Sequence, residues 1–220
     1  MKKSVWTDSI KLPEFPKADK EMKTEVLIIG GGICGILCAY MLEQKGIDYI
    51  LVEGSRIGYG ITKNTTAKIT SQHGLIYNKL IKSVGREKAQ MYLSANEKAL
   101  REYRLIAENI DCDFETKDAY VYSINDRKKI EDEVSAVNSL GFNAEFASET
   151  SLPFKTAGAV KFKNQAQFNP MKFLNEIVKG LNIYENTFIT DISENWTKFD
   201  GGKILADKII VATHFPFINK

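Results

Sequence analysis

The feature that most constrains this chain is a glycine turn at residues 30–35, with the sequence GGGICG. The apolar run 26–29 precedes it, and a continuous apolar run that ends in glycine is typical of a strand buried on both faces of a parallel sheet. Residues 33–45 then predict a helix, which Gly46 ends. Because the apolar run 49–52 predicts a second buried strand, the segments together indicate a βαβ unit with a right-handed crossover.

The glycines of this turn follow the pattern G-x-G-x-x-G at Gly30, Gly32 and Gly35. Glu53 ends the second strand, about 20 residues after the middle glycine, which is the spacing of a dinucleotide-binding fingerprint. Gly30 allows the tight turn, Gly32 lets a pyrophosphate approach the backbone, and Gly35 lets the helix pack closely on the strand. Backbone N–H groups at the helix start attract phosphates. The Glu53 carboxylate can accept hydrogen bonds from an adenosine ribose and repels a 2′-phosphate, which disfavours NADP.

This fingerprint alone does not separate FAD from NAD, and a glycine-rich turn without a ligand is a further alternative. A simple NAD-binding domain continues with alternating strands and helices. Residues 54–74 are instead polar, rich in Gly and Thr, and without a strong period. A loop of this length inside a compact domain is usually functional. An NAD-dependent dehydrogenase stays open as an alternative at this point.

The middle of the chain predicts a mixed helical and strand region. A long helix is expected because apolar residues recur at three- and four-residue steps, at Tyr92, Ala95, Ala99, Tyr103, Ile106 and Ile110. Residues 119–124 predict a strand, and Asn125 or Asp126 can cap the helix that follows it. Tyr120 and Tyr122 in that strand fit either a substrate pocket or core packing.

Buried strands return toward the end of the chain. Asn169 and Pro170 predict a helix start, with a helix that runs to about Lys179. Strands are expected at 145–147, 159–162, 183–192 and 204–212. The fold class predicted is α/β, with a Rossmann-like domain that has a parallel sheet and is interrupted by a mixed α+β insert. The expected parts are an N-terminal arm (1–24), a discontinuous nucleotide-binding domain (25–80 and 160–220) and the insert (81–159).

With these landmarks in place, the chain resembles the FAD-dependent oxidoreductases of the D-amino-acid oxidase (DAO) type, which include glycine, sarcosine and γ-glutamylputrescine oxidases. The similar run at 62–74 (TKNTTAKITSQHG) is that of a bacterial subgroup, some members of which carry a C-terminal Rieske iron–sulfur domain. The other segments that carry the resemblance are 24–32, 52–53, 58–68, 168–170, 183–188 and 208–213. The resemblance implies that the discontinuous domain binds FAD and that the insert is part of a substrate domain.

The resemblance also implies roles for individual residues. The ADP half of FAD would lie against Gly30, Gly31, Gly32, Ile33, Gly35, Glu53 and Gly54. The loop beneath the pyrophosphate, ribityl chain and flavin would comprise Thr62, Asn64, Thr65, Thr66, Ala67 and Lys68. Phe188 would make backbone contacts to adenine, and Thr213 would lie near the pyrophosphate, although His214 stands where relatives have glycine. We expect His214 to be a packed, structural residue.

The implied reaction is oxidation of an amine- or amino-acid-type C–N or C–H bond, with hydride transfer to flavin N5. His73 is the candidate catalytic residue, because a histidine at the end of the flavin-side loop can contact substrate, tune the flavin or move a proton; a packed histidine is the alternative. Family members continue well beyond the length of this chain. The chain is therefore expected to be a fragment, or else a truncated, non-catalytic flavin- or dinucleotide-binding remnant, with self-association through an incomplete sheet as a consequence.

Composition excludes several other classes. The net charge of +2 argues against a nucleic-acid or membrane-surface module, and 44% hydrophobic residues are enough for a core. The uncharged run 26–42 is shorter than the roughly 20 residues of a membrane span and is split by glycines. Three cysteines form no disulfide framework, which favours the cytoplasm. Cys34 and Cys38 share one helix face and are expected to be small buried residues, with no metal site.

Overall fold

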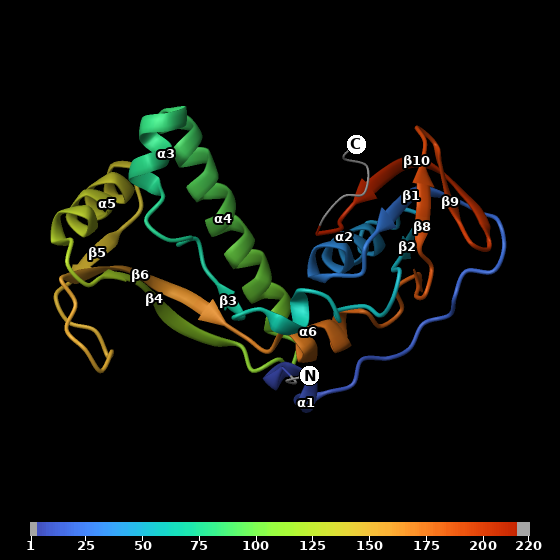
Figure 1. The fold of residues 1–220 in the computed structure, drawn as a ribbon, viewed down its shortest axis with the longest axis horizontal. Coiled ribbons are helices and arrows are strands. Elements are labelled where there is room, and N and C mark those ends of the chain that lie inside the picture. Colours follow the sequence, from blue (N-terminus) through green and yellow to red (C-terminus); the bar gives the residue numbers. More distant parts are fainter. Residues whose placement is uncertain (1–3, 215–220) are drawn as a thin grey trace. The chain divides into compact units, whose positions relative to one another are not determined.

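The computed structural model describes residues 4–214, which form two compact units (Figure 1). The first unit comprises Met1–Thr66 and Asn169–Lys220, and the second comprises Ala67–Phe168. These boundaries differ from the expected 80/81 and 159/160. The reason is that β3 (Lys68–Ile69) and β6 (Gly158–Gln167) pair with each other, so both ends of the inserted segment belong to one sheet.

The first unit is built on a six-stranded sheet in the order β7-β2-β1-β10-β9-β8. Its strands are β1 (Met22–Ile29), β2 (Tyr49–Val52), β7 (Ile183–Tyr184), β8 (Ile189–Ile192), β9 (Trp196–Phe199) and β10 (Gly202–Val211). Strands β7, β2, β1 and β10 run parallel to one another. Strand β9 pairs antiparallel with β10, and β8 pairs antiparallel with β9 at the edge of the sheet. Leu27, Ile28 and Leu51 are fully buried, as expected for central strands covered on both faces. The predicted α/β fold is confirmed.

One predicted strand is wrong. Residues 183–192 form two strands, β7 and β8, which lie at opposite edges of the sheet. The chain leaves the sheet between them, because Asn186 has a φ of +50° and the N–H of Thr187 donates to the carbonyl of Glu53 at 2.9 Å. Strand β9 was not predicted.

The helices of the first unit follow the local signals closely. Helix α2 (Ile33–Glu43) begins directly after the glycine turn. Helix α6 (Pro170–Ile177) is capped by the Asn169 side chain, as predicted, but ends two residues before Lys179. The N-terminal arm also contains a short helix, α1 (Val5–Ser9). This helix packs against α6 and against the 3₁₀ turn η1 (Thr62–Asn64). Leu12, also in this arm, is buried at 1% exposure.

The second unit is a small antiparallel sheet covered on one face by helices. Strand β6 pairs with β3, with β4 (Glu115–Ser123) and with β5 (Ala144–Ala147). The helices are α3 (Tyr77–Val84), α4 (Arg86–Ala107) and α5 (Arg127–Ser139), and Asp126 caps α5 as predicted. The core packs Phe162 and Val160 of the sheet against helix residues that include Ile130, Val137 and Tyr77.

The apolar stripe predicted for the long helix α4 is wrong in its first half, while Tyr103 and Ile106 in its second half are partly buried. Tyr92, Ala95 and Ala99 are exposed, and the buried face carries instead Ala89, Leu93, Leu100 and Ala107. Both stripes have helical spacing, so periodicity alone does not choose between them. The larger leucine side chains bury more apolar area against the sheet, and they set the rotation of the helix.

The outer edge of β4 bears on the predicted self-association. Among the described residues, β4 pairs only with β6. Its register is irregular between Lys117 and Ala119, and charged Glu115, Lys117 and Asp118 lie along it. Irregularities and charges are the features that blunt a sheet edge against pairing with another chain. Self-association through this sheet stays a prediction, and this edge does not favour it.

Two further expectations concern helices and cysteines. Over residues 4–214, no helix has the length and apolarity needed to cross a membrane. The burial predicted for Cys34 and Cys38 is wrong, because Cys34 is exposed and Cys38 is partly exposed. The buried face of α2 is formed by Gly35, Ile36 and Ala39, which turns the cysteine face outward.

Candidate dinucleotide-binding site

The turn between β1 and α2 has the geometry that its glycines predict. Gly30 has a φ of +114°, and a Cβ atom there would lie 2.9 Å from the carbonyl oxygen of Ala212 at the end of β10. A Cβ atom on Gly35 would lie only 1.9 Å from the carbonyl oxygen of Gly30. Neither position tolerates a side chain, because Gly30 has a positive φ and abuts the residues after β10, and because the start of α2 packs directly onto the turn at Gly35.

Gly32 differs from the other glycines of this turn, since the space beside it is open. It is the N-cap residue of α2, and a Cβ atom there would meet only the hydroxyl of Thr62, at 3.7 Å. Gly31 is enclosed instead, with the Cγ2 atom of Ile57 at 2.7 Å from its Cβ position. The open space at Gly32 lies at the positive end of the α2 dipole, where backbone N–H groups attract phosphate.

Two threonine hydroxyls belong to residues at this turn, since Thr62 lies beside Gly32 and the backbone of Thr213 lies beside Gly30. The Thr62 hydroxyl accepts a hydrogen bond from the N–H of Ile33 at 3.1 Å, and Thr62 is 6% exposed. The Thr213 hydroxyl oxygen is buried and has no hydrogen-bond partner among the described residues. The backbone N of Thr213 lies 3.2 Å from the Cβ position of Gly30, which places it beside the turn. A buried hydroxyl without a partner, next to an open helix N-terminus, fits the pyrophosphate of a dinucleotide.

The Glu53 carboxylate is fixed at the end of β2. One oxygen accepts from the N–H of Gly31 at 2.7 Å, and the other accepts from the N–H of Ser55 at 2.8 Å. A carboxylate has about four lone-pair sites, so both oxygens can still accept a ribose hydroxyl. The Gly31 contact was not predicted from the sequence, although the acid at the strand end was.

Phe188 lies beside Gly54, the residue that follows Glu53. A Cβ atom on Gly54 would come within 2.9 Å of the Phe188 ring, which is 65% exposed. The segment that carries the ring runs along the end of β2, because Asn186 donates to the carbonyl of Ser55 at 3.0 Å. Gly54 therefore lets an aromatic ring lie next to the residue expected to bind ribose.

The predicted flavin-side loop is divided between the two units. Asn64, Thr65 and Thr66 belong to the first unit, where Asn64 donates from its side chain to the carbonyl of Gly60 at 3.3 Å. Ala67 and Lys68 belong to the second unit. Ala67 is buried with a φ of +56°, and Lys68 is exposed.

His73 lies in the second unit and is exposed. Its Nδ1 atom is 2.8 Å from the hydroxyl of Tyr92 on α4, a pairing that the sequence did not reveal. A polar network continues nearby, since Ser71 contacts Glu97 at 2.5 Å. The packed role expected for His214 is wrong, because that residue is exposed.

Tyr120 and Tyr122 do not belong to the core. They are 44% and 42% exposed, and they line a hollow in the second unit together with Glu149, Thr150, Ser151 and Leu152. Because both side chains lie at the surface, the core alternative for this pair is wrong.

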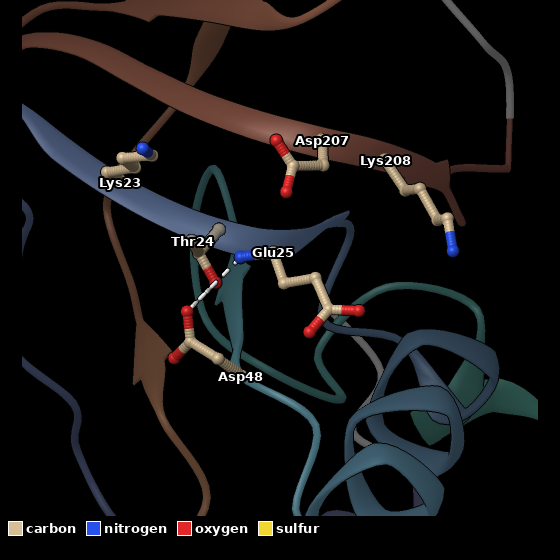
Figure 2. Close-up of a pocket in the computed structure, with 6 residues that line it drawn as sticks. All are labelled: Lys23, Thr24, Glu25, Asp48, Asp207 and Lys208. Carbon is tan, nitrogen blue, oxygen red and sulfur yellow. Dashed lines mark hydrogen bonds between the residues drawn. The ribbon is translucent and has the colours of Figure 1, made fainter.

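Another hollow lies in the first unit, near the start of β1 and away from the glycine turn, as Figure 2 shows. It is lined by charged and polar residues, namely Lys23, Thr24, Glu25, Asp48, Asp207 and Lys208. Asp48 is already engaged there, accepting from the Thr24 hydroxyl at 2.9 Å and from the N–H of Glu25 at 3.1 Å. Over residues 4–214, no group of three or more His, Cys, Asp or Glu side chains could hold a metal ion. The glycine turn, where the start of α2 adjoins open space at Gly32, is the candidate cofactor site.

Comparison with known proteins agrees with this geometry. The chain matches the family model described as DAO, FAD dependent oxidoreductase, over residues 25–216. Since the match extends over most of the sequence, the chain belongs to the DAO family of FAD-dependent oxidoreductases, as its landmarks predict. It is 36% identical, over 97% of its length, to the putative Rieske 2Fe-2S iron-sulfur protein YhfW of Bacillus subtilis, of which it covers 45%.

Solved structures show the same fold. The L-proline dehydrogenase from P. horikoshii superposes with a TM-score of 0.69 at 18% identity, over 88% of this chain and 53% of that one. The glycine oxidase from Geobacillus kaustophilus gives a TM-score of 0.61 at 18% identity, over 87% and 55%. The chain thus spans about half the length of the relatives it matches.

Proposed function

We propose that the first unit binds FAD at the glycine turn, and that the protein oxidises an amine or amino acid at a C–N or C–H bond. The observation that carries the proposal is the open space at Gly32 beside the Thr62 hydroxyl, together with the unpartnered hydroxyl of Thr213, whose backbone lies beside Gly30 of the same turn. Membership in the DAO family supports FAD rather than NAD as the occupant.

In this proposal each group of the site has a physical task. The start of α2 offers backbone N–H groups and the positive end of its dipole to the pyrophosphate. The hydroxyls of Thr62 and Thr213 donate hydrogen bonds to phosphate oxygens, while the Glu53 carboxylate accepts from ribose hydroxyls. Bound FAD would supply hydride acceptance at N5, which protein side chains do not provide.

The substrate class is inferred from the relatives. The names glycine oxidase and L-proline dehydrogenase support an amino acid or a related amine as the donor of hydride. His73 is the proposed proton-transfer residue, since its ring is exposed and the Tyr92 hydroxyl at 2.8 Å holds one nitrogen in a defined orientation. We expect His73→Ala to lower turnover while FAD affinity stays unchanged.

The first experiment is a cofactor titration of the purified chain. Protein is mixed with FAD, desalted, and examined for a visible flavin spectrum that is released on denaturation, with NADH titrated in parallel. Retained flavin with no NADH binding supports the proposal. Binding of NADH with no FAD retained would overturn it in favour of an NAD-dependent dehydrogenase.

A non-catalytic role is the second candidate, because the chain spans only about half the length of the relatives it matches. The FAD-loaded chain is mixed anaerobically with a panel of amino acids and amines. Bleaching of the flavin band by one of them supports an active oxidoreductase. Flavin that is retained but bleached only by dithionite supports a cofactor-binding chain without activity of its own.

A further inference from the structure

The segment before residue 25 lies outside the family match, yet it contacts the loops of the candidate site. The carbonyl of Pro16 accepts from the N–H of Glu185 at 2.9 Å, and the N–H of Ala18 donates to the hydroxyl of Thr187 at 3.0 Å. Near the start of the chain, the indole N–H of Trp6 donates to the carbonyl of Thr65 at 2.9 Å. The segment thus bonds to the loop that carries Phe188 and to the loop that carries Thr62.

Glu185 joins this segment to a third loop. Its side chain is fully buried, and one carboxylate oxygen accepts from the N–H of Ile57 at 2.8 Å. The other oxygen accepts from the N–H of Phe15 at 3.2 Å. A buried carboxylate is costly unless it is paired and hydrogen-bonded, so Glu185 holds both partners firmly.

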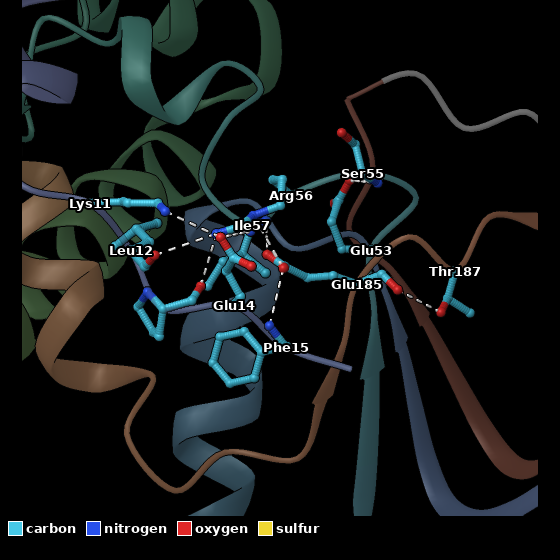
Figure 3. Close-up of polar contacts among 11 residues, drawn as sticks. Lys11, Leu12, Glu14, Phe15, Glu53, Ser55, Arg56, Ile57, Glu185 and Thr187 are labelled. Atoms are coloured by element: carbon cyan, nitrogen blue, oxygen red, sulfur yellow. Dashed lines mark hydrogen bonds and ion pairs between the residues drawn. The ribbon is translucent and has the colours of Figure 1, made fainter. Parts of the chain in front are cut away.

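Arg56 provides the charge that pairs with Glu185, as Figure 3 shows. Its Nε atom lies 3.2 Å from the Glu185 carboxylate, a close charge contact without an aligned hydrogen bond. The rest of the guanidinium faces the N-terminal segment. It donates to the carbonyl of Pro13 at 3.1 Å and forms an ion pair with Glu14 at 3.1 Å. The planar fork of arginine suits such a multiple contact, which lysine could not reproduce.

The loop held in this way supports the glycine turn. Ile57 packs its Cγ2 atom against Gly31, and the N–H of Gly58 donates to the carbonyl of Gly31 at 2.8 Å. Gly31 in turn donates to Glu53. A continuous set of contacts therefore connects the N-terminal segment to both the turn and the acid that the cofactor would use.

We propose that residues 4–20 are a clamp that holds the loops around the cofactor site in place, with Arg56 and Glu185 as the positioning residues that lock it. The proposal rests on the proposed FAD site. Since coupling between two binding events is reciprocal, the docked clamp strengthens FAD binding, and bound FAD strengthens docking of the clamp by the same factor.

The test measures FAD affinity in variants that remain folded. Arg56→Gln removes the charge that faces the N-terminal segment, and Trp6→Phe removes only the indole donor to Thr65. The matched control is Lys17→Ala, which lies on the same segment but pairs at the surface with Asp200, 3.3 Å away. Circular dichroism and urea unfolding of the cofactor-free chain establish that each variant is folded.

We expect Arg56→Gln to weaken FAD binding about tenfold, Trp6→Phe to weaken it severalfold, and Lys17→Ala to leave it unchanged. Hydrogen exchange of wild-type protein gives a readout that needs no variant: FAD should slow exchange of the Phe15 and Ala18 amides. Equal FAD affinity in all variants, with exchange at those amides unaltered by FAD, overturns the clamp alone. Failure of wild-type protein to bind FAD overturns the proposed function and the clamp together.

Discussion

Gly32→Ala separates a cofactor role from a folding role at the glycine turn. The new Cβ atom would meet only the Thr62 hydroxyl, at 3.7 Å, which is an ordinary contact. The backbone at Gly32 has a φ of −75° and a ψ of 176°, which alanine adopts without strain. The remaining cost is the poorer N-cap, about 0.5–1 kcal/mol.

The expected effect on FAD affinity is much larger. The methyl group would occupy the space through which the pyrophosphate approaches the backbone, and it would break one or two hydrogen bonds to a charged group. Each such bond contributes about 1.5–3 kcal/mol. A loss of about 3 kcal/mol corresponds to an affinity roughly 100-fold lower.

The assay combines urea unfolding of the cofactor-free chain with an FAD titration followed by flavin fluorescence. Gly35→Ala is the control with the opposite pattern. Its Cβ atom would lie 1.9 Å from the carbonyl oxygen of Gly30, so overpacking should destabilise the fold by about 3 kcal/mol. The reasoning is refuted if Gly32→Ala binds FAD within threefold of the wild-type affinity, or destabilises the chain as much as Gly35→Ala does.

Three other predictions concern the two units. Gly54→Val should displace the Phe188 ring, which lies 2.9 Å from the Cβ position, and lower affinity for FAD but not for FMN, which lacks adenine; an equal loss for both ligands would contradict this. Glu133→Ala removes the acceptor for the N–H of Tyr77 at 2.7 Å, and should lower the free energy of unfolding in urea by about 2–3 kcal/mol. An unchanged free energy of unfolding would contradict this prediction. Burial raises the pKa of Tyr49 to about 12, so the folded state favours the neutral phenol. The contribution of Tyr49 to stability is complete below about pH 10 and is lost toward pH 12, which lowers the free energy of unfolding by up to roughly 3 kcal/mol. In Tyr49→Phe, the free energy of unfolding should therefore fall less steeply between pH 10 and pH 12 than in the wild type.

Local signals in the sequence were enough to predict the βαβ unit and its glycine turn. A buried strand, a glycine pattern and an acid at the next strand end all lie within one short stretch, and each acts on its own neighbours. The same holds for the caps at Asp126 and Asn169, where a side chain bonds to backbone N–H groups two or three residues away. The role of Gly35 also follows from local sterics, because its Cβ atom would meet the carbonyl of Gly30, whereas Gly30 itself also abuts the distant Ala212.

Several features of the candidate site depended on contacts distant in sequence. The hydrogen bond between Glu53 and Gly31 and the contact between His73 and Tyr92 could not be predicted from the sequence, because no local sequence pattern indicates either of them. Glu185 lies within the strand predicted at 183–192, and nothing in the local sequence marks its side chain as buried. Only the fold shows it buried, with partners from the N-terminal segment and from the loop after β2.

The amino-acid sequence by itself determined which segments become strands, helices and turns near the cofactor site, since these depend on side-chain spacing, capping and glycine conformations. Tertiary structure alone decided the sheet order, which sends β7 and β8 to opposite edges, and the rotation of α4. It also decided where the two units divide. Strand pairing and helix rotation are chosen by how well distant surfaces bury apolar area and satisfy backbone hydrogen bonds together, and no single segment contains that information.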